Sequence, residues 1–186
     1  MSGQTGTVLV ADNDPTVAAG IASALRPDHT VRVAEGGEEA LRLLDDSIDV
    51  ALLDRRMPDR SGDEVLSEIR RRGIDCRVAM VTGVQPDFDV VEMPFDDYVV
   101  KPVDGEELRS LVARLLRRAE YRDRVRELYA LAAKRAALVA AKDDAELASD
   151  PRFEALKERF DRLDDDLSET VRTLEAREAF DAAIGD

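Results

Sequence analysis

Two stretches decide the fold: TVLVADNDP at residues 7–15 and VALLDRRMPD at residues 50–59. In each, a short run of apolar and β-branched residues ends abruptly in acidic and other polar residues. Runs of this length and composition predict buried strands. The aspartates therefore lie at the strand ends, which makes them the first candidates for a functional site.

Outside these stretches, short apolar runs alternate with amphipathic stretches. Strands are predicted at residues 7–11, 30–34, 50–53, 78–81 and 98–100. Helices are predicted at about 15–25, 37–46, 61–72 and 104–118, with a weaker one near 87–93. Because parallel strands need helical crossovers, the alternation predicts a doubly wound (βα)₅ α/β fold.

After about residue 118 the pattern becomes purely helical. Apolar residues fall at helical spacing from Val125 to Val139, and again from Phe153 to Leu174. Ser149-Asp150-Pro151 separates the two stretches with residues typical of helix caps and first turns. We expect a helical hairpin, and the first helix can equally be an extension of the helix at 104–118. The predicted domains are 1–118 and 119–186.

Composition narrows the class of protein. The 186 residues carry 27 Lys and Arg against 41 Asp and Glu, a net charge of −14. This balance argues against a general binder of nucleic acid or anionic membranes, which needs clustered cations. One cysteine, Cys76, favours a reducing compartment, and the sequence shows neither a signal peptide nor a membrane span. We expect a cytoplasmic protein.

The candidate site is a set of polar residues at the predicted strand ends, because ligands of doubly wound sheets bind beyond the carboxyl ends of the strands. The set is Asp12, Asn13, Asp14, Asp54, Thr82 and Lys101. Converging carboxylates suit Mg²⁺, and a carboxylate can act as nucleophile toward a phosphoryl group. Metal, ammonium and hydroxyl together would neutralise the phosphoryl oxygens.

Four motifs resemble the receiver domain of two-component response regulators. They are VLVADNDP from Val8, LLDRRMP from Leu52 with Gly62, MVTG from Met80 and DYVVKP from Asp97. The resemblance implies a flavodoxin-like sheet of strand order 2-1-3-4-5 and a phosphoacceptor signalling protein, with catalysis limited to its own phosphorylation and dephosphorylation.

The same resemblance assigns roles to individual residues. Asp54 would accept a phosphoryl group from a histidine kinase, and Lys101 would pair with the phosphoryl oxygens. The backbone carbonyl of Arg56 would help hold Mg²⁺. Thr82 would bind the phosphoryl group and draw the switch aromatic, Tyr98, inward.

Two features depart from the family pattern. Asn13 stands where the family usually has a second acid in direct contact with the metal, so we expect weaker Mg²⁺ binding. Asp12 would then act chiefly through water, and Asp14 is a further candidate ligand. Residues 85–96, where the fourth helix should lie, contain Pro86 and Pro94, which predicts a short or distorted helix.

Two alternatives stay open. Asp12-x-Asp14-x-Thr16 also resembles the nucleophile loop of haloacid-dehalogenase-like phosphatases, with Asp12 as nucleophile and Asp14 as general acid/base. That family needs further metal-binding acids after a later strand, and only helix is predicted beyond Lys101. The other alternative is a pseudo-receiver, an interaction module that is never phosphorylated, which only Asn13 favours.

The C-terminal stretch from Glu120 to about Thr173 contains the motif RELYALAAKRAAL from Arg126. Chiefly through this motif it resembles the HalX domain found behind receivers in haloarchaea. Residues 119–186 hold 12 basic against 18 acidic residues. A helix-turn-helix reader of DNA would need a third short helix and a basic recognition face, so direct DNA binding is not expected. We expect a homodimer or a protein partner through these helices.

Overall fold

The computed structural model describes residues 5–184, with side chains described up to Arg172. The chain divides into two compact units, one ending at Ala119 and the other beginning at Glu120. Helix α4 (Gly105–Ala141) contributes residues to both units. The sequence left open whether the helix after residue 118 is separate, and it is in fact the continuation of α4.

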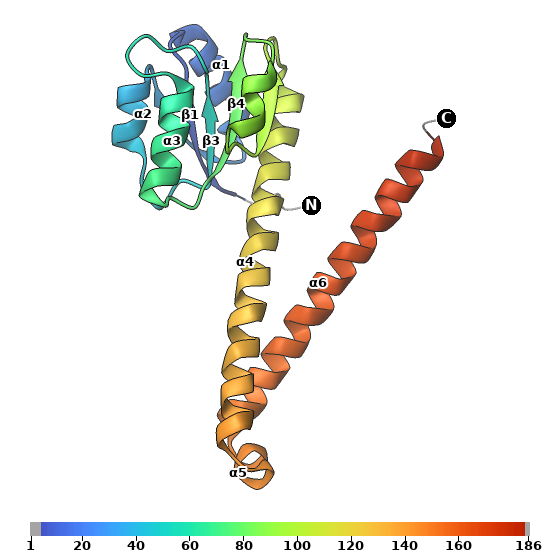
Figure 1. Cartoon of the computed structure of the whole chain (residues 1–186). Coiled ribbons are helices and arrows are strands. Elements are labelled where there is room, and N and C mark those ends of the chain that lie inside the picture. Colours follow the sequence, from blue (N-terminus) through green and yellow to red (C-terminus); the bar gives the residue numbers. More distant parts are fainter. Residues whose placement is uncertain (1–4, 185–186) are drawn as a thin grey trace. The chain divides into compact units, whose positions relative to one another are not determined.

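The first unit is built on one parallel sheet of five strands in the order β2-β1-β3-β4-β5, which confirms the predicted fold class and strand order (Figure 1). Its strands are β1 (Thr7–Ala11), β2 (Thr30–Ala34), β3 (Val50–Leu53), β4 (Arg77–Thr82) and β5 (Asp97–Val100). The register places Ala11 beside Leu53 and Leu53 beside Met80. The carboxyl ends of β1 and β3 are therefore level, and β4 continues two residues further, to Thr82, beside Val100 of β5.

Alternation along the strands sends side chains to two cores, because successive residues of a strand point to opposite faces. On one face Leu9, Leu53 and Met80 pack with α2 (Gly37–Leu43) and α3 (Gly62–Arg72). On the other face, Val10 and Leu52 pack with α1 (Pro15–Leu25) and the first part of α4. Both faces of the sheet are thus covered, as a parallel sheet requires.

Local chemistry sets the ends of α3. Ser61 and Glu64 form a reciprocal capping box at its start, which satisfies two backbone N–H groups. Gly73 follows its end at φ 71°, a left-handed conformation that favours glycine. The predicted helix at 61–72 is therefore displaced by one residue at its start, because Ser61 caps the helix from outside.

The weak helix predicted near 87–93 is a short 3₁₀ helix, η1 (Phe88–Glu92), capped by Asp87. None of its residues is buried, and Phe88 and Val91 are 90% and 78% exposed. The prediction of a short or distorted helix in this segment agrees with this finding.

The second unit contains the second part of α4, a short helix α5 (Asp144–Ser149) and α6 (Pro151–Ile184). Pro151 is the first residue of α6, and Asp150 ends α5. The predicted hairpin is present, but α5 adds a third, short helix that the sequence did not predict. Asp143 and Glu146 close a capping box at its start.

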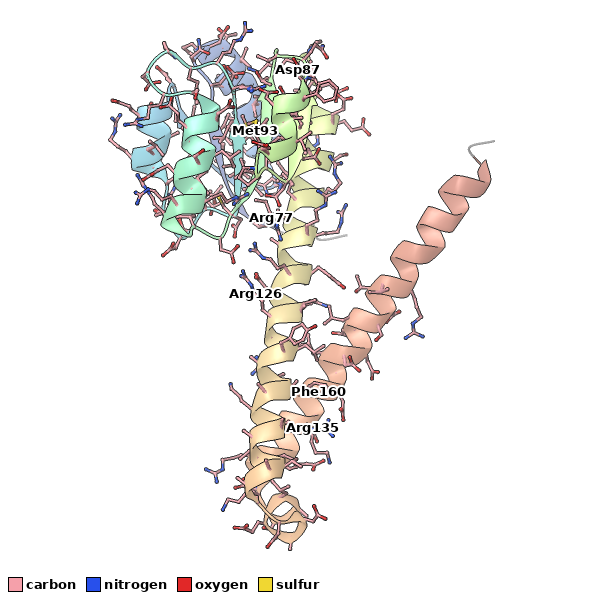
Figure 2. The ribbon with its side chains drawn as sticks, viewed as in Figure 1. Arg77, Asp87, Met93, Arg126, Arg135 and Phe160 are labelled. Atoms are coloured by element: carbon pink, nitrogen blue, oxygen red, sulfur yellow. The ribbon has the colours of Figure 1, made fainter. Side chains whose placement is uncertain are left out.

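Polar and cation–π contacts join α4 and α6. Arg159 donates to Glu127 at 2.5 Å, and the Arg135 guanidinium lies 5.5 Å from the centre of the Phe160 ring (Figure 2). Of the predicted α6 seam, Leu167 is buried, whereas Phe153, Leu156, Phe160 and Leu163 are half-buried. Leu174 lies outside the residues whose side chains are described. Along the described part of the chain, none of the helices has the length and apolar character needed to span a membrane.

Candidate functional site

The polar residues singled out at the strand ends come together in the first unit. Asp12 follows β1, Asp54 follows β3, Thr82 ends β4 and Lys101 follows β5. Backbone hydrogen bonds continue the sheet into these ends: Asp54 N–H donates to the Ala11 carbonyl and Lys101 N–H to the Thr82 carbonyl, each at 2.8 Å. The sheet itself therefore positions the site.

Lys101 joins the two aspartates. Its Nζ donates to Asp12 Oδ2 at 2.5 Å and to Asp54 Oδ1 at 3.2 Å. Asp12 is 2% exposed and Asp54 is 7% exposed, so both carboxylates are almost removed from water. Buried charges need partners, and two carboxylates that share one ammonium leave one negative charge in excess. The peptide bond between Lys101 and Pro102 is cis.

Backbone amides from the loops hold the remaining carboxylate oxygens. Asp54 Oδ2 accepts from the Arg56 N–H at 3.2 Å, and Asp12 Oδ1 accepts from the Asp14 N–H at 3.0 Å. Gly62 allows α3 to start close to this loop, because a Cβ there would lie 2.3 Å from the Asp54 carbonyl oxygen. The position of Gly62 therefore leaves no room for a side chain, which explains the glycine after Met-Pro in the motif.

Asn13 and Asp14 occupy the loop after β1. Asp14 Oδ1 accepts from the backbone of Thr16 at 2.8 Å and of Val17 at 3.3 Å, so this carboxylate caps α1. The sequence offered Asp14 as a metal ligand, and the oxygen that caps α1 would have to leave these N–H groups in order to bind a metal. Asn13 is exposed, and its side chain is not engaged elsewhere in the described residues.

The oxygen set at the site fits a hard divalent cation. Mg²⁺ takes one or two carboxylates and completes its octahedron with carbonyls, amides and water. Asp12 and Asp54 are the two buried carboxylates, while the Arg56 carbonyl and the Asn13 amide have no hydrogen-bond partner among the described residues. Within the described residues, no group of three or more His, Cys, Asp or Glu side chains is gathered as a metal site. Neutral oxygens would therefore supply the rest of the ligands.

Thr82 and Tyr98 meet at one residue, Val84. The Thr82 hydroxyl accepts from the Val84 N–H at 3.3 Å, and the Tyr98 hydroxyl donates to the Val84 carbonyl at 2.9 Å. Thr82 is 1% exposed, whereas Tyr98 is half-buried with its ring 5.6 Å from that of Phe95. A movement of the Thr82 hydroxyl would therefore displace the Val84 backbone, to which the Tyr98 hydroxyl is hydrogen-bonded.

Arg55 is a residue at the site that the sequence analysis did not single out. Its guanidinium donates to Asp63 at the start of α3, with three contacts of 3.1 Å, and to Asp89 of η1. The pKa of Arg55 is raised, and the Asp89 carboxylate has the largest effect. Burial lowers the pKa in part, and the Tyr98 and Asp63 side chains raise it further. Its position directly after Asp54 was the available sequence signal, but no pattern indicated which carboxylates it would meet.

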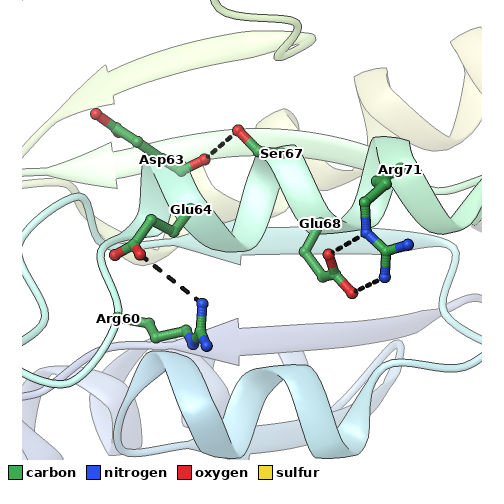
Figure 3. Close-up of a pocket in the computed structure, with 6 residues that line it drawn as sticks. All are labelled: Arg60, Asp63, Glu64, Ser67, Glu68 and Arg71. Atoms are coloured by element: carbon green, nitrogen blue, oxygen red, sulfur yellow. Dashed lines mark hydrogen bonds and ion pairs between the residues drawn. The ribbon is translucent and has the colours of Figure 1, made fainter.

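One surface hollow of the first unit lies away from this cluster, and another borders it at Lys101. One, of about 320 Å³, covers the outer face of α3, where charged side chains pair with one another (Figure 3). The other, of about 530 Å³, is a mainly apolar groove beside the site. It is lined by one face of α1 and by residues 101–108, including Val17, Ile21, Lys101 and Val103.

Two family models match the chain: a response regulator receiver domain over residues 8–113 and a HalX domain over residues 117–184. A Haloferax volcanii protein named as a candidate transcriptional regulator is 46% identical over 171 residues, which are 91% of this chain and 29% of that protein. The transcriptional regulatory protein CpxR of Escherichia coli is 36% identical over 118 residues, 61% of this chain and 50% of CpxR. The chain thus spans half or less of these relatives.

Solved structures also resemble the first unit. The response regulator protein TrrA of Thermotoga maritima, in complex with Mg²⁺-BeF, has a TM-score of 0.53 and 31% identity. The match covers 60% of this chain and 99% of that one. The response regulator DrrB of Thermotoga maritima, an OmpR/PhoB homologue, has a TM-score of 0.56 and 29% identity over 62% of this chain and 54% of DrrB.

Proposed function

Because this chain belongs to the response regulator receiver family and carries a HalX domain behind its receiver, we propose that it is the phosphoacceptor of a two-component phosphorelay. Asp54 is the acceptor, and a sensor histidine kinase is the donor. The observation that carries the proposal is the Lys101 ammonium, which bridges the buried carboxylates of Asp12 and Asp54.

The proposed reaction is a phosphoryl transfer between two side chains. A carboxylate oxygen of Asp54 attacks the phosphorus of a phosphohistidine, the P–O bond forms, and the P–N bond breaks. The electron pair stays on the histidine nitrogen, which takes up a proton. Such transfers depend mainly on positioning and on neutralising the phosphoryl oxygens.

Residues around Asp54 supply most of those requirements. Lys101 Nζ already lies 3.2 Å from Asp54 Oδ1, within reach of a phosphoryl oxygen bound there. Mg²⁺ bound by Asp12, Asp54, Asn13 and the Arg56 carbonyl would neutralise charge on the transferring group. The Thr82 hydroxyl would exchange its hydrogen bond with the Val84 N–H for one with the phosphoryl group. Movement of the Val84 backbone would then alter the hydrogen bond from the Tyr98 hydroxyl to the Val84 carbonyl.

A phosphatase of the haloacid-dehalogenase type fits the contacts less well. Asp12 would be its nucleophile, and Lys101 contacts Asp12 and Asp54 alike, so this contact does not separate the two functions. Asp14 would be its acid/base, yet it caps α1. Beyond Lys101, the described residues contain helices and no strand that could carry further metal-binding acids.

We assign phosphoryl acceptance to the predicted domain 1–118 and output to the predicted domain 119–186. The apolar groove between α1 and residues 101–108 opens beside Lys101, so a kinase helix docked there would bring its histidine near Asp54. The C-terminal unit would serve output through a second copy or a protein partner. The Haloferax relative is named for transcription, but an acidic C-terminal unit favours a route other than direct DNA contact.

Phosphate-affinity electrophoresis tests the proposal. The chain is incubated with acetyl phosphate and Mg²⁺, together with Asp54→Asn and Asp14→Asn variants. We expect a retarded, EDTA-sensitive band from the parent and from Asp14→Asn, and none from Asp54→Asn. A retarded band that survives in Asp54→Asn would contradict the proposal, and its absence from the parent would favour the pseudo-receiver.

A further inference from the structure

The loop between β3 and α3, residues 54–61, carries the Arg56 carbonyl of the proposed metal site. Among the described residues, the backbone groups of residues 56–60 form no hydrogen bond with the main chain of another element. Pro58, in the middle of this stretch, has no N–H to donate. Side chains must therefore hold this part of the loop in place.

Two side chains inside the loop contact the elements around it. Met57 is 7% exposed and packs into the core that α2 and α3 cover. Arg60 forms an ion pair with Glu64 of α3, but both side chains are exposed and the closest N–O distance is 3.8 Å. Such a pair contributes little to stability.

Asp59 gives the loop a firmer attachment, at the start of α2. Its Oδ1 accepts from the Gly37 N–H and its Oδ2 from the Glu38 N–H, each at 2.9 Å. The first N–H groups of a helix have no partner within the helix, and they favour a negative charge. One carboxylate from a distant part of the chain thus satisfies two of these groups.

The adjacent glycines at the start of α2 allow this close approach. A Cβ on Gly36 would lie 2.8 Å from Asp59 Oδ2, and a Cβ on Gly37 would lie 2.2 Å from the Arg60 carbonyl oxygen. Neither glycine has a positive φ, so contact with the loop, and not backbone conformation, requires them.

We propose that Asp59 is a positioning residue for the Mg²⁺ site, because it holds the loop that carries the Arg56 carbonyl against the start of α2. This inference rests on the proposed function of Asp54. It adds α2 to the elements on which metal binding depends, although α2 supplies none of the proposed ligands.

The physical basis is the strict geometry of magnesium. Mg²⁺ requires a near-ideal octahedron with ligands at about 2.0–2.1 Å, so a carbonyl that shifts with its loop is a poor ligand. Asn13 contributes no charge, which leaves two carboxylates and makes each neutral oxygen more important. Groups that orient a metal ligand without touching the metal commonly affect affinity strongly.

Two matched aspartates separate this role from general stability. Asp59→Asn keeps the shape of the side chain but leaves one acceptor oxygen for two N–H groups. Asp49→Asn is the control, because Asp49 is also exposed and its Oδ2 accepts from the Thr7 N–H at 2.7 Å, at the opposite end of β1 from the site. Isothermal titration of the full chain with Mg²⁺ gives each Kd, and thermal unfolding gives each Tm.

We expect Asp59→Asn to raise the Kd for Mg²⁺ about tenfold. Asp49→Asn should keep the Kd of the parent, even where its Tm falls as much. Gly37→Ala leaves Asp59 intact but displaces the loop, so it should also raise the Kd. Gly20→Ala is its control, because a Cβ on Gly20 meets no atom within 4 Å.

Phosphorylation by acetyl phosphate supplies a second readout, followed by intact mass at increasing Mg²⁺. Asp59→Asn should need more Mg²⁺ for half of its maximal rate, and a high concentration of Mg²⁺ should restore the rate of the parent. A loss of rate that high Mg²⁺ does not restore would overturn the positioning role, because it would place the defect outside metal capture.

Equal Kd values in Asp59→Asn and Asp49→Asn, with Mg²⁺ bound by the parent, would also overturn the inference and leave the proposed function intact. If the parent neither binds Mg²⁺ nor takes up a phosphoryl group, the proposed function fails and the inference fails with it.

Discussion

Different interactions stabilise each of the two units of this chain. In the receiver unit, both faces of the sheet carry fully buried apolar side chains, such as Leu52 and Leu53. In the C-terminal unit, the described residues include three buried side chains, Leu131, Leu147 and Leu167, each still 6–9% exposed. Ion pairs between exposed side chains and a cation–π contact also join α4 and α6.

This difference matches what each unit is proposed to do. A phosphoacceptor site needs oxygens and an ammonium fixed to within fractions of an ångström, and strand ends in a close-packed core provide that. A unit that exchanges partners benefits from weaker contacts that rearrange at low cost. Matched substitutions in the two units test this difference.

The largest expected effect comes from truncating one leucine in each unit. Leu52→Ala removes a side chain that is 1% exposed between two helices and the sheet, and we expect a loss of about 2–5 kcal/mol in the free energy of unfolding. Leu131→Ala, at 8% exposure, should cost clearly less because its surroundings can relax. Chemical denaturation followed by circular dichroism measures both, and equal losses would show that the C-terminal unit has a comparable core.

A smaller effect is expected at the metal ligands of the receiver. Asn13→Asp adds a carboxylate at the loop after β1 and should lower the Kd for Mg²⁺ about tenfold, or about 1.4 kcal/mol. Asp14→Asn is the control, because asparagine also caps helices well and the structure uses Asp14 as a cap. Isothermal titration at fixed salt gives both values, and an unchanged Kd in Asn13→Asp means that residue 13 does not face the metal.

Acid titration compares two carboxylates, one in each unit. Backbone amides of Glu38 and Arg60 lower the pKa of Asp59 to about 2, and the Arg152 side chain lowers that of Asp150 to about 2. A depressed pKa stabilises the fold above the unfolded value of 3.8, and this contribution is lost as the pH falls toward 2. Asp59 ties α2 to the loop after β3, so Asp59→Asn should flatten the fall in Tm over this range.

Asp150→Asn is the counterpart in the C-terminal unit. Its partner, Arg152, is two residues away and 89% exposed, so the pair is strongly screened and local. We expect a smaller change in the same titration. A larger effect from Asp150 than from Asp59 would contradict the view that local ion pairs contribute little there.

The smallest effect is expected from the cation–π contact. Arg135→Gln should lower the free energy of unfolding of the C-terminal unit by about 0.5–1 kcal/mol, because the guanidinium no longer covers the Phe160 ring. Lys134→Gln removes the same charge from an exposed neighbour and serves as the control. Thermal unfolding followed by far-ultraviolet circular dichroism compares the two, and identical midpoints would show that the contact adds no stability.

The sequence predicted most of the receiver, because its signals are local. Apolar runs ending in Asp12, Asp54 and Lys101 located the strand ends, and parallel pairing then brings such ends to one edge of a sheet. The distortion near residues 85–96 was also visible, since Pro86 and Pro94 interrupt the helical pattern.

What the sequence could not predict depends on the direction of individual side chains. The sequence offered Asp14 as a metal ligand, and its role as the cap of α1 depends on the geometry of the turn before that helix. Arg55 gained its importance from contacts with Asp63 and Asp89, 8 and 34 residues away. Helix α5 was missed because six residues are too few to show a helical period.

The most direct test of the account is to find which carboxylate becomes phosphorylated. The full chain is treated with acetyl phosphate and Mg²⁺, the acyl phosphate is reduced with borohydride, and the modified residue is located by peptide mass spectrometry. The account predicts that Asp54 alone is converted. Conversion of Asp12 would contradict it and would favour the phosphatase alternative.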